Sequence, residues 1–248
     1  MAATFMSPRH ALAKTEPLHM CRPHASSGGP PVRLRGFVDR RDAGQQLADA
    51  LGADRGRDVL VMGIPRGGVA VAAEIARSLG ADLDVVVARK VGAPSQPELA
   101  LGAVTADGKM FMNSVLAREL GVSLWMFRIL AGEQRAEARR QERRLRGQRP
   151  AARVSGRTVI LVDDGLATGA TVRAAIRSVR QAGPACLVVA VPVAAQPTCD
   201  AVRAEADELV CLLAPDPFIA VGVHYVDFQP IADEDVQRLL AEGAPSST

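Results

Sequence analysis

Aromatic residues are scarce in this chain of 248 residues, which contains one Trp, one Tyr and six Phe. The sequence therefore shows no aromatic platform on which the bases of a nucleic acid would stack. No apolar run approaches the length of a membrane span, so no membrane partner is expected. A formal net charge of +3 is too small to indicate a binding partner by itself.

Cysteine is also infrequent. The four cysteines form no CxxC pair and show no spacing typical of metal ligands. We therefore expect reduced, mostly buried thiols in a cytoplasmic protein. These cysteines are Cys21, Cys186, Cys199 and Cys211.

Composition indicates one globular unit with appendages. Hydrophobic residues make up 48% of the chain, enough to bury one sizeable α/β core. Residues 1–33 are rich in Pro, Ser, Gly, His and Arg and lack the continuous apolar stretch of a secretory signal. We predict a disordered extension over residues 1–33, a core domain over residues 34–240 and a tail over residues 241–248.

The most informative segment is residues 159–171, where an apolar strand leads through two carboxylates and a loop of small residues into a helix. Val159–Val162 is typical of a strand buried on both faces of a parallel sheet. Asp163 and Asp164 follow at its carboxyl end, where open α/β sheets collect ligands. The loop then reaches a helix N-terminus, whose free amides and dipole favour phosphate. The two carboxylates would instead accept hydrogen bonds from vicinal hydroxyls or hold a hydrated magnesium ion.

This segment resembles the signature of the type I phosphoribosyltransferases, which bind 5-phosphoribosyl-1-pyrophosphate (PRPP). The resemblance implies that Asp163 and Asp164 are catalytic, take the 2′ and 3′ hydroxyls of the ribose, and hold Mg²⁺ through water. It also implies that the loop after them wraps the 5′-phosphate of PRPP. The residues of this phosphate loop are Gly165, Leu166, Ala167, Thr168, Gly169, Ala170 and Thr171. An ordinary strand-turn-helix crossover, capped by Thr168, is the alternative.

A second motif, Gly-Ile-Pro-Arg-Gly-Gly at residues 63–68, follows a short apolar strand at residues 58–62. The resemblance makes this segment the pyrophosphate loop, with a cis peptide bond between Pro65 and Arg66. Arg66 would face the pyrophosphate as a catalytic residue, and Gly67 and Gly68 would belong to the PRPP site. A plain turn is the alternative.

Two cations and a hairpin follow. Leu83–Ala88 is predicted to be a strand, with Arg89 binding PRPP and Lys90 acting as a catalytic residue at its carboxyl end. Solvated strand-end charges are the alternative. Leu101–Asn113 is predicted to form a hairpin that turns at residues 106–109. The resemblance implies a flexible loop here that closes over the reacting centre, and an edge hairpin without a role is equally compatible.

The remaining pattern completes an α/β fold. Strands are predicted near residues 185–192 and 209–213, and helices near residues 39–51, 123–146 and 197–206. The resemblance implies a five-stranded parallel sheet flanked by helices, in the order 3-2-1-4-5 of the type I phosphoribosyltransferase fold. It also implies a small C-terminal hood, mainly residues 214–230, that receives the base. Its candidate base-binding residues are Phe218, Tyr225 and Phe228, unless these are core aromatics of a C-terminal cap.

The resemblance implies a Mg-dependent phosphoribosyltransferase that moves the phosphoribosyl group from PRPP to a nitrogenous base and releases pyrophosphate. Ala167 stands where hypoxanthine-guanine enzymes carry an acid, which makes the loop similar to that of adenine-type enzymes and slightly favours a purine-like acceptor. A homodimer is expected from the habit of the family. The alternative is a non-catalytic protein that senses PRPP or a nucleotide and binds nucleic acid through the Arg-rich helix.

Overall fold

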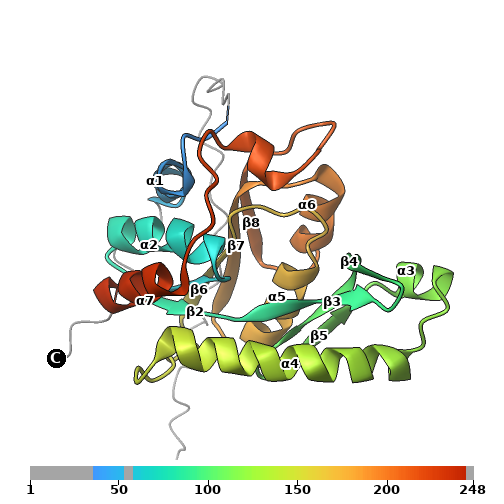
Figure 1. The fold of residues 1–248 in the computed structure, drawn as a ribbon. Coiled ribbons are helices and arrows are strands. Elements are labelled where there is room, and N and C mark those ends of the chain that lie inside the picture. The colour runs from blue at the N-terminus through green and yellow to red at the C-terminus, as the bar shows by residue number, and fades with distance from the viewer. Residues whose placement is uncertain (1–35, 53–57, 244–248) are drawn as a thin grey trace, which may run out of the picture.

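The computed structural model describes residues 36–52 and 58–243. Its centre is a parallel sheet in the order β2-β1-β6-β7-β8 (Figure 1). This confirms the predicted five-stranded parallel sheet of the 3-2-1-4-5 pattern. The predicted extension, residues 1–33, lies outside the described residues. The strands are β1 (Val59–Gly63), β2 (Asp82–Val85), β6 (Thr158–Val162), β7 (Cys186–Val193) and β8 (Glu208–Leu213).

The winding of the sheet reverses between β1 and β6, which are neighbours in space, with Val61 opposite Ile160. In open α/β sheets the crevice beyond the carboxyl ends of two such strands is the usual place for a ligand. Both strands are almost completely buried. Their continuous apolar sequences reflect this burial, because helices cover both faces of the sheet.

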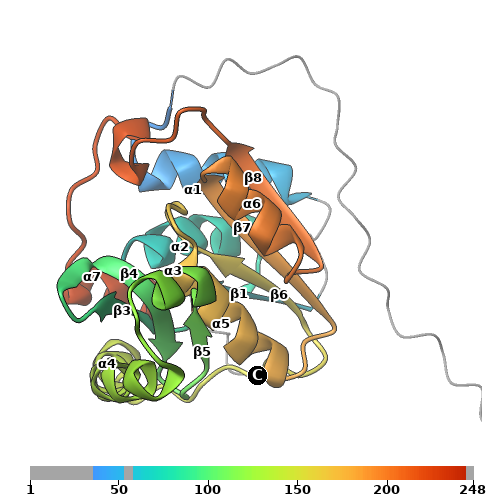
Figure 2. The ribbon, with the colours of Figure 1, turned by 90° about the vertical axis from the view of Figure 1, so that its right-hand side faces the viewer.

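One face of the sheet packs against α1 (Arg40–Ala50), α2 (Gly67–Leu79), α7 (Asp233–Glu242) and the second half of α4 (Leu124–Arg146). The other face packs against α5 (Ala170–Gln181) and α6 (Gln196–Arg203) (Figure 2). The three predicted helices are present within a few residues of their expected bounds. Helix α7 was not predicted, and it extends two residues into the segment expected to be a tail.

A second, antiparallel sheet contains β3 (Ala88–Ala93), β4 (Gln96–Thr105) and β5 (Met110–Met112). The predicted strand at residues 83–88 is therefore wrong in its second half, and Arg89 and Lys90 lie inside β3 rather than at the rim of the parallel sheet. The breaker-rich residues 91–98 form a tight hairpin, because Gly92 lets β3 approach β4 where a Cβ would overlap the Pro97 carbonyl. The predicted hairpin near residues 101–113 is confirmed as β4 and β5.

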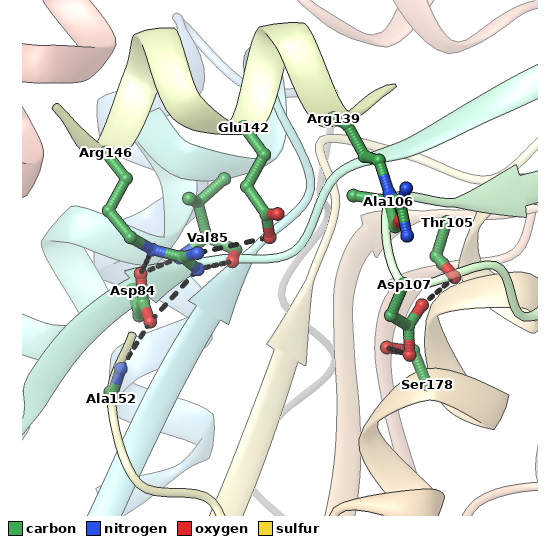
Figure 3. A network of polar contacts seen from close by, with 10 residues as sticks. All are labelled: Asp84, Val85, Thr105, Ala106, Asp107, Arg139, Glu142, Arg146, Ala152 and Ser178. Atoms are coloured by element: carbon green, nitrogen blue, oxygen red, sulfur yellow. Dashed lines mark hydrogen bonds and ion pairs between the residues drawn. The ribbon is translucent and has the colours of Figure 1, made fainter. Parts of the chain in front are cut away.

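Helix α4 follows a short helix, α3 (Ser114–Glu119), and is tied to both sheets (Figure 3). Its Arg146 donates from Nε and Nη2 to the buried carboxylate of Asp84 in β2, at 3.2 and 3.3 Å. Its Arg139 donates from Nε to the carbonyl of Ala106, in the turn after β4, at 2.9 Å. Within the helix, Arg146 also forms an ion pair with Glu142 at 3.2 Å. Helix α4 is thus held along its second half.

The hood, residues 214–230, is closed by the N-terminal end of the described chain. Phe37 is fully buried in it and donates its N–H to the carbonyl of His224 at 2.7 Å. The short 3₁₀ helix Val221–His224 lies at the centre of this segment. The hood therefore consists of two segments far apart in sequence, and α1 leads directly from one of them to the sheet.

Two further expectations concern cysteines and membranes. Cys199 and Cys211 are free thiols, as predicted. Cys186 is disulfide-bonded, so the expectation of a reduced thiol is wrong there. Among residues 36–52 and 58–243, every helix is too short or too polar to cross a bilayer.

Candidate functional site

Two half-buried carboxylates lie at the carboxyl end of β6, beside the switch point. The Asp164 N–H donates to Oδ1 of Asp163 at 2.9 Å, which fixes the orientation of the first carboxylate. Burial raises the pKa of Asp163 well above its usual value, and the neighbouring Asp164 carboxylate raises it further. Burial also raises the pKa of Asp164, although its hydrogen bond with Arg40 opposes that shift. Burial and mutual repulsion thus disfavour the charged form of both carboxylates, so the pair favours a bound cation or hydroxyl donors.

Arg40, the first residue of α1, is a member of this site that the sequence did not reveal. Its Nε donates to Oδ2 of Asp164 at 2.8 Å, and both side chains are largely buried. Its Nη1 donates to the carbonyl of Gln229 at 2.9 Å, and its guanidinium lies 3.8 Å from the ring centroid of Phe228. Arg40 thus connects the acid pair to the hood. No local sequence pattern indicates this role, because Asp164 lies 124 positions away along the chain.

The predicted pyrophosphate loop lies directly against the acid pair. Its peptide bond between Pro65 and Arg66 is cis, as predicted. A Cβ at Gly67 would overlap Oδ2 of Asp164, and a Cβ at Gly68 would lie 2.6 Å from the Val162 carbonyl. The pyrophosphate loop therefore approaches the end of β6 and the acid pair too closely for any side chain at positions 67 and 68. Only glycine at positions 67 and 68 permits this approach.

The predicted phosphate loop, residues 165–171, leads into α5 as expected. Gly169 is the N-cap of α5 and has a φ of 70°, a conformation that favours glycine. The loop is anchored from outside, because the Thr198 hydroxyl donates to the carbonyl of Ala167 at 2.6 Å. Leu166 is buried, whereas Ala167 and Thr168 are exposed. The helix N-terminus and an exposed hydroxyl thus face outward beside the acid pair, where they can receive an anion.

Arg66, Arg89 and Lys90 line one cavity of about 620 Å³, although they come from β1–α2 and from β3. The Arg66 side chain is half exposed, and its Nη1 lies 4.0 Å from Oδ1 of Asp233. Lys90 forms an ion pair with Glu98 of β4 at 2.9 Å, and Glu98 is almost completely exposed. The structure thus brings the three predicted cations together, with β3 supplying two of them from outside the parallel sheet.

The three aromatic candidates of the hood have different surroundings. Tyr225 is buried between Phe37 and Phe228, with ring centroids 5.3 and 4.9 Å away, and its hydroxyl donates to the Asp164 carbonyl at 2.6 Å. Burial and the Asp164 carboxylate raise the pKa of Tyr225, so its hydroxyl stays protonated. This placement favours the core alternative for Tyr225. Phe218 and Phe228 are only partly buried.

The arginines of α4 are mostly occupied within the protein. Arg140 pairs with Glu137, Arg144 with Asp233 at 2.5 Å, and Arg146 with Asp84. Arg135 and Arg139 donate to the carbonyls of Asp107 and Ala106. Three of these arginines are thus paired with carboxylates, which weakens the observation that favoured nucleic-acid binding.

The sequence matches the family described as phosphoribosyl transferase domain over residues 40–227. This range contains β1, β6, the acid pair, both glycine-bearing loops and most of the hood. The chain therefore belongs to the phosphoribosyl transferase domain family.

Two curated relatives come from Mycobacterium tuberculosis strains CDC 1551 / Oshkosh and ATCC 25618 / H37Rv, and are named "Putative phosphoribosyl transferase MT0597" and "Putative phosphoribosyl transferase Rv0571c". Each is 42% identical over 204 residues, which cover 82% of this chain and 46% of the relative. The chain thus spans less than half the length of these relatives.

A solved structure, that of TT1426 from Thermus thermophilus, has 46% sequence identity and a TM-score of 0.72. The alignment covers 85% of this chain and 100% of that one. This chain therefore shares its fold with a solved protein to which it is 46% identical in sequence.

Proposed function

We propose that this chain is a magnesium-dependent phosphoribosyltransferase that moves the 5-phosphoribosyl group of PRPP to a nitrogenous base and releases pyrophosphate. The observation that carries the proposal is the contact between the acid pair and the pyrophosphate loop at the switch point. C1 of PRPP lies between the ribose hydroxyls and the pyrophosphate. A site for its reaction therefore needs carboxylates and an anion loop side by side.

In the proposed reaction the bond between C1 and the pyrophosphate oxygen breaks, and pyrophosphate leaves with the bonding electrons. A base nitrogen forms the new bond to C1 and releases its proton to solvent. Asp163 and Asp164 accept hydrogen bonds from the ribose hydroxyls and hold the sugar in place. Arg66, Arg89 and Lys90 offset the charge that develops on the leaving group.

The acid pair fits Mg²⁺ held through water. Two adjacent carboxylates with raised pKa values gain from a nearby cation, and Mg²⁺ at phosphate sites keeps several waters. When bound, the ion would neutralise pyrophosphate oxygens and polarise the ribose hydroxyls. Arg40 supplies one positive charge to Asp164, which leaves Asp163 as the carboxylate with more need of the ion.

A purine-like base is the proposed acceptor, received by the hood. Phe218 and Phe228 are the partly buried rings on the hood and supply its stacking surface. We also propose a homodimer, supported by the exposed apolar side chains Leu124, Trp125 and Ile129 on the first half of α4. The regulatory alternative with nucleic acid is not proposed, because Arg140, Arg144 and Arg146 of α4 already pair with carboxylates.

The test is a calorimetric titration of magnesium-PRPP into the whole chain and into the Asp163→Asn/Asp164→Asn double variant. Saturable heat in the wild type, lost in the double variant, is expected. Release of pyrophosphate on adding adenine, hypoxanthine or guanine would then identify the acceptor. No PRPP heat from a folded wild type, with or without these bases, would overturn the proposed function.

A further inference from the structure

The cavity beside the pyrophosphate loop is much larger than a pyrophosphate needs, at about 620 Å³, and its far wall is α4. This wall contributes Leu130, Glu133, Gln134 and Gln141 to the lining. Residues 134 and 141 are two helical turns apart and therefore lie on the same side of the helix. The wall thus presents two carboxamides to the strand that carries Arg89.

Both carboxamides bind Arg89. Its Nε donates to Oε1 of Gln134 at 3.1 Å, and its Nη1 donates to Oε1 of Gln141 at 3.4 Å. These bonds restrict the rotation of the guanidinium and leave Nη2 free of protein partners among the described residues. The free edge belongs to a side chain that lines the cavity, together with Arg66 and Lys90.

The partners of Arg89 are neutral, as is the Ala106 carbonyl to which Arg139 donates, whereas several other arginines of the described chain bind carboxylates. Arg40, Arg146 and Arg173 each bind a carboxylate, which cancels most of their charge. A carboxamide also orients a guanidinium through a hydrogen bond, which is weaker than that to a carboxylate, and it carries no charge. Arg89 is therefore held in place while no bonded carboxylate offsets its positive charge, which is what binding an anion requires.

Nearby carboxylates on α4 do not change this result. Glu137 has a lowered pKa, chiefly through its hydrogen bond with Arg140 and to a smaller extent through Arg89. Its hydrogen bonds nevertheless go to Arg140, at 2.9 Å from Nε. Glu133 lines the cavity, and no ion pair joins it to Arg89 within the described part of the chain.

Helix α4 is also fixed, so the two carboxamides have a defined position. Figure 3 shows its Arg146 reaching Asp84 of β2 and its Arg139 reaching Ala106 after β4. The Asp84 carboxylate additionally accepts the N–H of Ala152 at 2.8 Å, which fastens the segment after α4. The helix is thus bound to both sheets within two turns of Gln141.

We propose that Gln134 and Gln141 are positioning residues that orient Arg89 toward the pyrophosphate group without neutralising it. This inference rests on the proposed function for the identity of the ligand. It predicts that the charge of the residue at position 134, and not merely a hydrogen bond there, decides the affinity for pyrophosphate. Position 134 is the better test site, because its bond to Arg89 is the shorter one.

The experiment compares Gln134→Glu with Gln134→Leu in the whole chain, using magnesium-pyrophosphate and magnesium-PRPP as calorimetric probes. Glutamate keeps the shape and binds Arg89 more strongly, but it cancels the charge of the guanidinium. We expect about a tenfold loss of pyrophosphate affinity or more, with a midpoint of thermal unfolding equal to or above that of the wild type. Leucine removes the bond and keeps the charge, so its loss of affinity should be smaller.

Gln181→Glu is the matched control, since residue 181 is exposed at the C-terminal end of α5, away from the carboxyl edge of the sheet. It should change pyrophosphate affinity less than about twofold, because exposed distant charges are screened. A purely structural role would rank the variants the other way, with glutamate retaining affinity and leucine losing it. That ranking would overturn the inference.

The two proposals fail separately. A wild type that binds pyrophosphate but not PRPP would overturn the proposed function while leaving the variants interpretable. If the wild type binds PRPP, and Gln134→Glu binds pyrophosphate as tightly as the wild type does, only the positioning role is overturned. Absence of pyrophosphate binding by the wild type would also overturn the positioning role.

Discussion

Replacing Gly68 by Ala should destabilise this protein, although Ala normally stabilises a helix. Gly68 lies in the first turn of α2, where helix propensity alone predicts a gain of about 0.5–1 kcal/mol for Ala. The new Cβ, however, would lie 2.6 Å from the Val162 carbonyl and 2.8 Å from Cα of Asp163. Both are backbone atoms of β6 and its carboxyl end, and no side-chain rotation can relieve the contact.

The magnitude follows from the two opposing effects. Overpacking of a close contact costs about 1–3 kcal/mol, so the net loss at Gly68 should be about 1–2 kcal/mol. Gly132 is the matched control, because it is exposed inside α4 and a Cβ there would meet nothing within 4 Å. Gly132→Ala should therefore gain the full helical benefit of about 0.5–1 kcal/mol. The two variants should differ by about 1.5–3 kcal/mol.

Thermal and urea unfolding followed by circular dichroism measure this difference. For a chain of this size, 1 kcal/mol corresponds to about 2–4 °C in the midpoint. Gly68→Ala should also weaken PRPP binding, since α2 and its loop must move away from Asp163. A Gly68→Ala protein that unfolds at or above the wild-type temperature and binds PRPP normally would refute the close approach of the two loops.

Two further predictions concern charge. Because the pKa of Asp163 is raised in the folded state, stability is lost as pH rises from about 4, the unfolded value, through that raised pKa. Asp163→Asn should therefore stabilise the ligand-free protein near pH 7.5 and hardly at all near pH 4, as urea unfolding at both pH values will show. Asp84→Ala should destabilise the protein by about 1–3 kcal/mol, measured by the same method, because Arg146 loses its buried partner and keeps only the more exposed Glu142.

Each of these has a clear contrary result. Equal stability of Asp163→Asn and the wild type at both pH values would mean that the acid pair carries no electrostatic strain. An Asp84→Ala protein within about 0.5 kcal/mol of the wild type would mean that α4 is held mainly by its apolar contacts.

The parts of the fold that were predicted correctly depend on local patterns. The run at residues 159–171 indicated a strand, an acid pair and a helix start, and each is present because adjacent residues determine it. The hairpin near residue 106 was recognised in the same way, whereas the cis bond before Arg66 was implied by the resemblance to a known family. Capping side chains, such as Ser123 at the start of α4, make such helix bounds readable from sequence.

The wrong predictions concern elements whose bounds depend on contacts between residues far apart in sequence. The end of β2 at Val85 depends on pairing with β1, and the continuation of the chain into β3 depends on pairing with β4. Residues 83–93 alone do not distinguish one long strand from two strands in different sheets. The packing of Phe37 against residues 214–230 was likewise not predicted, because the two segments are far apart in sequence.

The sequence by itself determined the class of site, since the order of strand, carboxylates, small loop and helix is written in consecutive residues and follows from local geometry. Only the tertiary structure decided that Arg40 neutralises Asp164 and that two glutamines hold Arg89 without neutralising it. The physical reason is that hydrogen bonds and ion pairs act over a few ångströms, whatever the separation along the chain. Partners 45 and 124 positions apart become neighbours only when the sheets and helices have packed.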